Sequence, residues 1–432
     1  MSPLVSVVVP VYNVENYVAD SLRSICNQSF RNLEIIIVYT KSSDNSIAVC
    51  EEFARQDPRI TIVSEDKQGL GVARDKGISI AQGEWICFLD SDDYVHSDFV
   101  KILLNAVLKY ECLTAHCRFE KVCGCKAESD VGKGDVTLLD WEKYFCYLYT
   151  HQSEGHSPFG AWANIYHRSL FEHVSFGELR YAEDSAFAPR IIYAARHRPI
   201  AVIDRVLYYY LQREGSLLHQ TPSLIRMDQF RAKKIALDFF ESVGANNMYH
   251  LFYPVYCSCL MNDYIDLAMY LPEKKNEYQI LHDTFIKELP VMKEYCFPYL
   301  GLHPHAQFAW EMIWDKKDEI ILYGCGLIGK RILDRLRYFG INIKEIWDNK
   351  FKEAKEIDGI PCRQMHGGIS KDYLILIAIA DLGAEHEARI DLSNLGYKNF
   401  MGSSAVIEAL KLARIKKFFP EVLEMLKQNI EA

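Results

Sequence analysis

The first hundred residues repeat one pattern four times: a short apolar run, a polar tail, and then a stretch with helical periodicity. The runs begin about 25–30 residues apart, which is the spacing of successive βα units. They are almost purely apolar rather than alternating, which is typical of strands buried on both faces of a mainly parallel sheet. The pattern therefore predicts an open α/β fold. The four predicted strands are Val5–Val9, Glu34–Val38, Arg59–Val63 and Glu84–Leu89.

Each predicted strand is followed by a polar tail, and acidic residues occur in three of the four tails. Because ligands of open α/β sheets bind beyond the carboxyl ends of the strands, we expect the tails to line one cleft. The last tail reads Asp90-Ser91-Asp92-Asp93. Alternate carboxylates at a strand end can hold Mg²⁺ or Mn²⁺, which commonly share oxygen ligands with a diphosphate. The alternative interpretation is a solvated acidic turn or a helix cap.

Three motifs in order resemble the family 2 glycosyltransferases with a GT-A fold. They lie at Val5–Asn13, Gly69–Gly77 and Phe88–Asp93. The resemblance continues through residues 161–168, Tyr181–Asp184 and residues 208–216, so it covers 1–220. It implies an inverting transfer of a sugar from a nucleotide-diphosphate donor to a hydroxyl of a glycan or lipid-linked glycan. Bacterial surface polysaccharide biosynthesis is the setting that it implies.

The resemblance also implies roles for individual residues. Asp184 occupies the position of the general base, and Asp90 and Asp92 form the D-x-D motif that holds Mn²⁺ or Mg²⁺. Trp162 is a candidate wall of the sugar pocket, and Arg213 and Ser216 match a segment that closes over the diphosphate. The full set of expected donor-binding residues is Pro10, Tyr12, Glu15, Thr40, Arg74, Asp90, Ser91, Asp92, Trp162, Arg213 and Ser216.

One tail departs from the family pattern. Two aspartates and a glycine usually follow the second strand, where one carboxylate meets the base, but this chain has Tyr39, Thr40 and Lys41. Threonine can form a hydrogen bond but brings no charge. A uridine diphosphate sugar is the donor implied by the family, and a degenerate, non-catalytic nucleotide-binding scaffold is the alternative that this departure keeps open.

Composition narrows the choice of partner and compartment. The chain has 49 basic and 58 acidic residues, a formal net charge of -9, which argues against a nucleic-acid partner. No apolar run approaches the roughly 20 residues that span a bilayer, and the N-terminus has no pattern typical of a signal peptide. The 13 scattered cysteines indicate reduced thiols. We therefore expect a cytoplasmic protein, with peripheral contact on the inner face of the membrane as an alternative.

The pattern along the chain predicts three parts. Residues 1–220 form the transferase domain, with a nucleotide-binding half at 1–109 and an acceptor half at 110–220. Residues 221–317 form a helical linker or extension, and 318–432 form a small Rossmann-like α/β domain.

The third part contains Gly324-x-Gly326-x-x-Gly329 after a predicted strand, and Asp348 about 20 residues further on. Three interpretations stay open for this part. They are a structural or assembly domain that mediates homo-oligomer formation, a regulatory nucleotide-binding domain, and an NAD-dependent oxidoreductase.

A basic stretch, Ala405–Phe419, predicts a helix near the C-terminus. Its apolar stripe is incomplete, since Lys417 shares a face with Val406 and Leu410. Such a helix can lie on an anionic membrane or pack on its own domain.

Overall fold

The computed structural model describes residues 2–122, 134–151, 155–157, 160–212, 227–270, 273–295, 306–351, 353, 355–366, 370–379 and 382–418. These residues form two compact units, Met1–Asp263 and Tyr264–Ala432, and each is described by itself. The predicted α/β class is confirmed in both. The unit boundary lies between the predicted boundaries at 220 and 317, because the first two helices after residue 226 belong to the first unit up to Asp263.

The predicted βα units form one half of a nine-stranded sheet in the first unit. Their strands pair in parallel in the order β3-β2-β1-β4. Since β1 is flanked by β2 on one side and β4 on the other, the strand order reverses between β1 and β4. This is the place where open α/β sheets bind ligands. The strands are β1 (Val5–Val11), β2 (Leu33–Thr40), β3 (Ile60–Glu65) and β4 (Trp85–Phe88).

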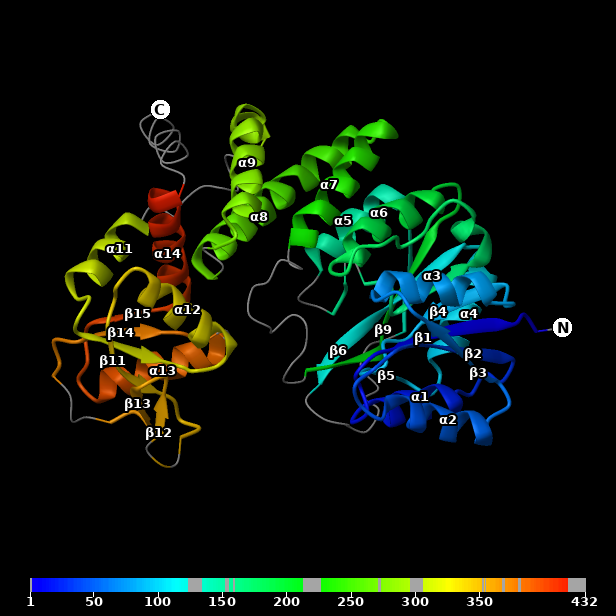
Figure 1. Ribbon diagram of the computed structural model, residues 1–432, viewed down its shortest axis with the longest axis horizontal. Helices are drawn as coiled ribbons and strands as arrows, with labels where there is room; N and C mark the ends of the chain where they lie inside the picture. Colours follow the sequence, from blue (N-terminus) through cyan, green and yellow to red (C-terminus); the bar gives the residue numbers. More distant parts are fainter. Residues whose placement is uncertain are drawn as a thin grey trace. The chain divides into compact units, whose positions relative to one another are not determined.

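Helices cover both faces of this half, because its strands carry apolar side chains on both faces of the sheet. Figure 1 shows α1 and α2 on one side of β1–β3 and α3 on the other. Gly77 of α3 allows a close approach to β1, because a Cβ at this position would lie 2.3 Å from Cγ1 of Val8. The helices are α1 (Val18–Cys26), α2 (Ser46–Gln56) and α3 (Leu70–Ile80).

The other half of the sheet is mixed and continues in the order β8-β6-β9-β5, with β7 also paired to β9. β8 is antiparallel to β4 and to β6, whereas β6 and β9 are parallel. The strands are β5 (Tyr94–Val95), β6 (Thr114–Val122), β7 (Val136–Leu139), β8 (Asn164–His167) and β9 (Ile200–Leu211). The helices are α4 (Phe99–Tyr110), α5 (Trp141–Thr150), the 3-10 helix η2 (Arg168–Glu172) and α6 (Glu183–Ala194).

Two helices complete the first unit. α7 (Met227–Ser242) packs along α6, and α8 (Asn246–Tyr270) follows it. Phe240 of α7 and Phe252 of α8 make edge-on contacts with Phe145 of α5, with ring centroids 5.4 and 6.2 Å away. All three rings are buried, so α7 and α8 share a core with the acceptor half.

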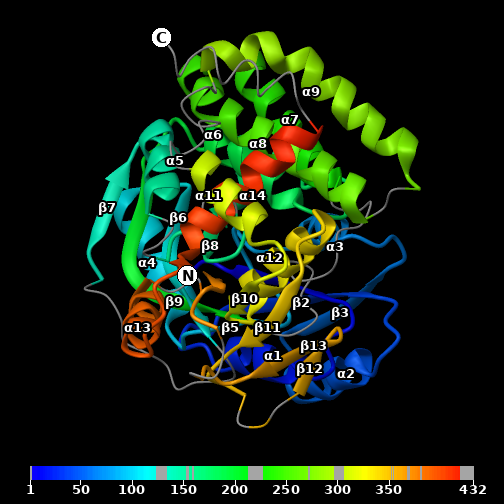
Figure 2. The same ribbon diagram turned by 90° about the vertical axis from the view of Figure 1, so that its left-hand side faces the viewer.

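The second unit contains a six-stranded sheet in the order β12-β13-β11-β10-β14-β15. All pairs are parallel except the β12–β13 hairpin at the edge, so the unit has the doubly wound topology expected from the sequence. In Figure 2, which is turned by 90° from Figure 1, the strands β10, β11, β13 and β12 of this sheet can be followed. The strands are β10 (Ile320–Tyr323), β11 (Ile343–Trp347), β12 (Lys355–Ile357), β13 (Ile360–Arg363), β14 (Leu374–Ile377) and β15 (Phe400–Met401). The helices are α9 (Lys275–Tyr295), α11 (Ala306–Asp315), α12 (Leu327–Tyr338), α13 (Leu382–Asn394) and α14 (Ser403–Phe418).

The glycine-rich loop lies between β10 and α12, as predicted. Gly324 has φ 107°, and a Cβ on Gly329 would lie 2.0 Å from the carbonyl oxygen of Gly324, so both positions require glycine. The carboxylate of Asp348 accepts hydrogen bonds from the backbone N–H of Cys325 (3.0 Å) and from its thiol (3.1 Å). Asp348 therefore stabilises the loop itself.

The basic stretch forms α14, which packs against α11 and α12. Val406 and Leu410 are fully buried, and the ammonium of Lys417 lies 4.1 Å from the ring centroid of Tyr338 in α12. The packing interpretation accounts for these contacts. In the part of the chain that the structure describes, no helix is both long and apolar enough to cross a membrane.

Candidate functional site

Reciprocal hydrogen bonds join the tails of β1 and β2. Oδ1 of Asn13 accepts from the N–H of Ser43 (2.8 Å), and Oγ of Ser42 accepts from the N–H of Asn13 (3.1 Å). Oε2 of Glu15 accepts from the N–H of Asn45 (2.8 Å), while the N–H of Glu15 donates to Asp44 (2.9 Å). Glu15, predicted to lie near the nucleotide, therefore also fixes the start of α2.

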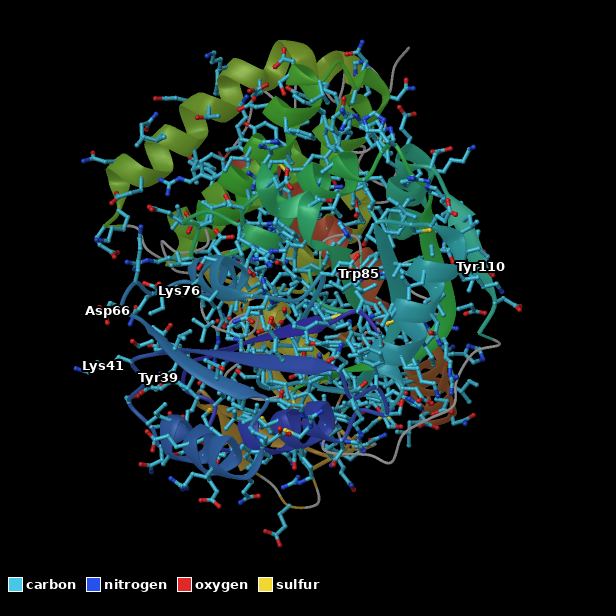
Figure 3. The ribbon with its side chains drawn as sticks, turned by 90° about the vertical axis from the view of Figure 1, so that its right-hand side faces the viewer. Tyr39, Lys41, Asp66, Lys76, Trp85 and Tyr110 are labelled. Carbon is cyan, nitrogen blue, oxygen red and sulfur yellow. The ribbon has the colours of Figure 1, made fainter. Side chains whose placement is uncertain are left out.

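The other residues expected near the base differ in exposure. Pro10 and Thr40 are buried at the strand ends, whereas the Tyr12 side chain is 49% exposed. The Tyr39 hydroxyl accepts a 3.0 Å hydrogen bond from the N–H of Ser42, which holds the Tyr39 ring against its own tail. In Figure 3 Lys41 points outward, and Trp85, at the start of β4, lies far from it.

The centre of the candidate site is a buried arginine surrounded by carboxylates. The guanidinium of Arg74, from α3, lies 2.7 Å from Oδ1 of Asp90, 2.8 Å from Oε1 of Glu183 and 2.7 Å from Oδ1 of Asp184. Arg74 has no exposed surface. Its predicted role as a donor contact stays a prediction, and in the structure its guanidinium pairs with these three carboxylates.

Burial, together with the crowding of carboxylates in this cluster, raises the pKa values of the acids. Burial, followed by the charge of Asp184, raises the pKa of Glu183 to about 8. Burial also raises the pKa of Asp184 to about 6, although Arg74 opposes the shift. The pKa of Asp90 is raised by burial and by the nearby charge of Asp92. One guanidinium does not offset three carboxylates, so their mutual repulsion adds to the effect of burial.

The segment before α6 fixes the direction of the predicted base. Ala182 adopts the left-handed conformation (φ 58°, ψ 24°), which costs a non-glycine residue about 1–3 kcal/mol. Glu183 and Asp184 then form the first turn of α6. Oδ2 of Asp184 accepts from the N–H of Ala161 (3.3 Å), and its side chain stays 18% exposed. Asp184 is therefore held by neighbours on both oxygens yet is open to a ligand.

Asp93 has a role that the sequence did not reveal. Its Oδ2 accepts a 2.8 Å hydrogen bond from the hydroxyl of Tyr208, and its Oδ1 accepts from the N–H of Leu211 (2.8 Å). The same hydroxyl of Tyr208 accepts from the N–H of Asp90 (3.2 Å). Burial raises the pKa of Asp93 well above its ordinary value. Asp93 therefore ties the acidic tail of β4 to β9, while Asp90 and Asp92 alternate with buried Ser91 on the same tail.

Trp162 lies in a stack of aromatic rings. Its ring is stacked on Tyr208 (centroids 4.8 Å apart) and on Tyr210 (5.6 Å), and the edge of Phe119 meets it at 4.9 Å. The indole is half-buried against the core of the first unit. These contacts make Trp162 a rigid residue near the acidic tail. Arg213 and Ser216, the expected closing segment, lie outside the described residues.

The donor set of the acidic tail fits a hard divalent cation. Asp90 and Asp92 offer only carboxylate oxygens, which Mg²⁺ and Mn²⁺ prefer, and an added cation would relieve the repulsion that raises the pKa of Asp90. Magnesium is typically held by one or two carboxylates together with substrate phosphates. Among the described residues, no group of three or more His, Cys, Asp and Glu is spaced to hold a metal ion by itself.

Comparison with known proteins decides the family. The family described as "Glycosyl transferase family 2" matches residues 6–175. "Glycosyltransferase GlyG" of Streptococcus pneumoniae serotype 4 is 31% identical over 231 residues, which cover 50% of this chain and 74% of the relative. The chain belongs to glycosyltransferase family 2. The resemblance seen in its motifs is thereby confirmed.

Two further comparisons concern a curated relative and a solved structure. "Putative glycosyltransferase EpsH" of Bacillus subtilis (strain 168) is 36% identical over 232 residues, or 51% of this chain. The match spans 64% of the EpsH relative, less than two thirds of its length. Among solved structures, S. aureus TarS 1–349 in complex with UDP-GlcNAc matches with a TM-score of 0.44 at 18% identity, covering 85% of this chain and 98% of that chain.

Proposed function

We propose that this family 2 glycosyltransferase moves a sugar from a nucleotide-diphosphate donor to a hydroxyl of a glycan or lipid-linked glycan, with inversion at the anomeric carbon. The setting would be bacterial surface polysaccharide biosynthesis, and a uridine diphosphate sugar is the donor that the family favours. The observation that carries the proposal is the Arg74 cluster. It unites Asp90, from the tail that follows β4, with Asp184, from the first turn of α6.

In this proposal Asp184 is the general base. It accepts the proton of the acceptor hydroxyl while that oxygen bonds to the anomeric carbon, and the bond from this carbon to the diphosphate breaks. The nucleoside diphosphate leaves with the electron pair. A pKa of about 6 leaves Asp184 mostly ionised at neutral pH yet more basic than an ordinary aspartate. The first turn of a helix also favours the ionised carboxylate.

Asp90 and Asp92 would hold the divalent cation. When bound, Mn²⁺ or Mg²⁺ neutralises negative charge on the departing diphosphate. Arg74 keeps Asp90 and Asp184 in one arrangement, and Asp93 fixes the tail that carries Asp90 and Asp92. The aromatic stack around Trp162 provides a rigid wall beside this tail.

A donor screen followed by a turnover assay tests the proposal. Uridine, guanosine and thymidine diphosphate sugars would be added to the full chain with and without Mn²⁺, and the melting temperature recorded. A donor at about 100 times its dissociation constant should add roughly 2.7 kcal/mol of stability. We expect stabilisation by a uridine donor that needs the metal, and donor hydrolysis or transfer that stops in excess chelator.

Three results would contradict the proposal. Turnover that persists in excess chelator would remove the metal, and stabilisation by guanosine or thymidine donors alone would remove the uridine preference. A folded chain that binds a donor with metal but neither hydrolyses nor transfers it would be the degenerate scaffold. Asp20→Asn is a suitable control for any substitution that removes an aspartate charge at the site, because Asp20 is an exposed residue of α1 paired with Arg23.

A further inference from the structure

Two buried side chains of α7 hold the segment that carries the proposed base from both ends. Oδ2 of Asp228 accepts a 3.0 Å hydrogen bond from the N–H of Arg180, directly before Tyr181–Asp184. Nζ of Lys233 donates a 2.8 Å hydrogen bond to Oγ of Ser185, directly after it. Asp228 is 9% exposed and Lys233 is 4% exposed. The two contacts therefore lie on either side of Tyr181–Asp184, the segment whose backbone sets the direction of the Asp184 side chain.

The enclosed segment needs external support. Ala182 has a positive φ, which the surrounding structure must impose because an alanine does not favour it. The peptide plane that follows sets the direction in which Glu183 and Asp184 leave the backbone. A small relaxation at Ala182 would therefore swing both carboxylates relative to Arg74 and to an acceptor.

Lys233 is an unusual residue for a helix interface. Its ammonium lies 5.4 Å from the ring centroid of Phe252 in α8, and burial lowers its pKa to about 8. A hydrophobic residue of similar volume would avoid the desolvation of a buried amine. The next residue, Lys234, is exposed and pairs with Asp238 on the same helix, as an ordinary surface lysine does. The contact of Lys233 with Ser185 gives a reason for the buried amine.

We propose that α7 is a positioning element of the active site, in which Lys233 and Asp228 hold the Tyr181–Ser185 turn so that Asp184 faces the acceptor hydroxyl. The proposal rests on the proposed function of Asp184 as the base. Both residues of α7 lie beyond residues 6–175, the part that the family comparison matches. Lys233 acts through Ser185, whose Oγ accepts its hydrogen bond.

Kinetics of matched variants test this role. Lys233→Met removes the amine and keeps most of the volume, Ser185→Ala removes its acceptor, and Lys234→Met is the control. Since small misplacements of a reacting group cost up to about a hundredfold in rate, we expect kcat to fall about ten- to a hundredfold in the first two variants, with donor KM unchanged. The double variant should be no slower than the slower single variant, because both remove one contact.

Hydrogen exchange of the full chain gives a readout that does not depend on activity. Peptides spanning residues 178–187 should exchange faster in Lys233→Met and Ser185→Ala but not in Lys234→Met. Unchanged exchange and unchanged kcat in Ser185→Ala would overturn the positioning role. It would also be overturned if the fold loss in kcat of the double variant equalled the product of the two single losses. If the parent chain lacks transferase activity, the proposed function fails, whereas the exchange result still decides whether α7 holds the turn.

Discussion

The hydroxyl of Tyr208 donates to Asp93 and accepts from the backbone of Asp90, so one side chain of β9 binds both ends of the acidic tail. Neighbouring carboxylates of this tail consequently have different roles. Asp93 is 1% exposed and holds the tail in place, while Asp92, one of the two carboxylates proposed to hold the cation, is only partly buried.

The two aspartates should respond differently to substitution. Asp93→Ala removes the acceptor of the buried Tyr208 hydroxyl and of the part-buried N–H of Leu211, so we expect a loss of about 1–3 kcal/mol in the free energy of unfolding. Asp92→Ala should leave the melting temperature near that of the parent while abolishing the metal-dependent response to donor. Denaturant titration and the donor screen measure the two effects. Equal destabilisation by both substitutions would contradict this separation.

Asp184→Asn should separate a catalytic role from a structural one. Asparagine keeps the shape and can still accept a hydrogen bond from Arg74, but it cannot take a proton. Because a positioned general base contributes about 10²–10⁴ in rate, turnover should fall at least about a hundredfold. Donor-induced stabilisation and melting temperature should stay close to the parent values. Turnover within a few-fold of the parent would leave Asp184 with only a structural role, in its contacts with Arg74 and Ala161.

The pH dependence of turnover should report the acid cluster. With the pKa of Asp184 raised to about 6, kcat/KM should increase as pH rises through about 6 and then level off. An aspartate with an ordinary pKa would already be ionised well below this range. A rate profile recorded from pH 4.5 to 8 on the parent chain measures the midpoint. A flat profile down to pH 5 would exclude Asp184 with a raised pKa as the base.

The stability of the protein should depend on Glu183 in the opposite pH direction from an ordinary carboxylate. Its pKa of about 8 in the folded state exceeds the ordinary value of 4.5, so the folded state binds more protons between these values. The contribution of Glu183 to the free energy of unfolding is fully present below about pH 4.5 and is lost as pH rises through about 8. Glu183→Gln should therefore lose less melting temperature than the parent between pH 5 and 8. The exposed Glu178 provides a control, and a Glu178→Gln variant should follow the parent curve.

Truncation tests where the catalytic unit ends. A chain ending at residue 272 keeps α7 and α8, and we expect it to fold and to retain donor-induced stabilisation. A chain ending at residue 220 exposes Phe145, which is buried against Phe240 and Phe252, and should melt at a much lower temperature. Circular dichroism melts of both chains give the answer. Equal melting temperatures would show that the helices contribute little to the first unit.

The sequence predicted those parts of the fold that depend on local pattern. The apolar runs at Val5–Val9 and Glu34–Val38 became β1 and β2, because strands buried on both faces require continuous apolar residues. The D-x-D tail was likewise found from its place after a strand. The short strand β5 was not predicted, because its two residues pair only with distant β9.

Contacts between distant segments explain what the sequence could not show at the site. Arg74 meets Glu183 and Asp184 across more than a hundred residues, and no local pattern indicates that an arginine in α3 will be wholly buried. The roles of Asp93 and Lys233 depend on similar long-range partners. A signal was present in the case of Asp93, since a third aspartate directly after a D-x-D motif has no need to bind the cation.

The paired tails of β1 and β2 constrain any attempt to redesign donor preference. Asn13 and Glu15 each exchange hydrogen bonds with the stretch Ser42–Asn45, so a new sequence at Tyr39–Lys41 would be grafted onto a loop whose shape is set by another strand. Exchanging one tail alone would leave the other tail without the groups that these hydrogen bonds need. A chimera of two family members that is designed to change donor preference should therefore exchange both tails together.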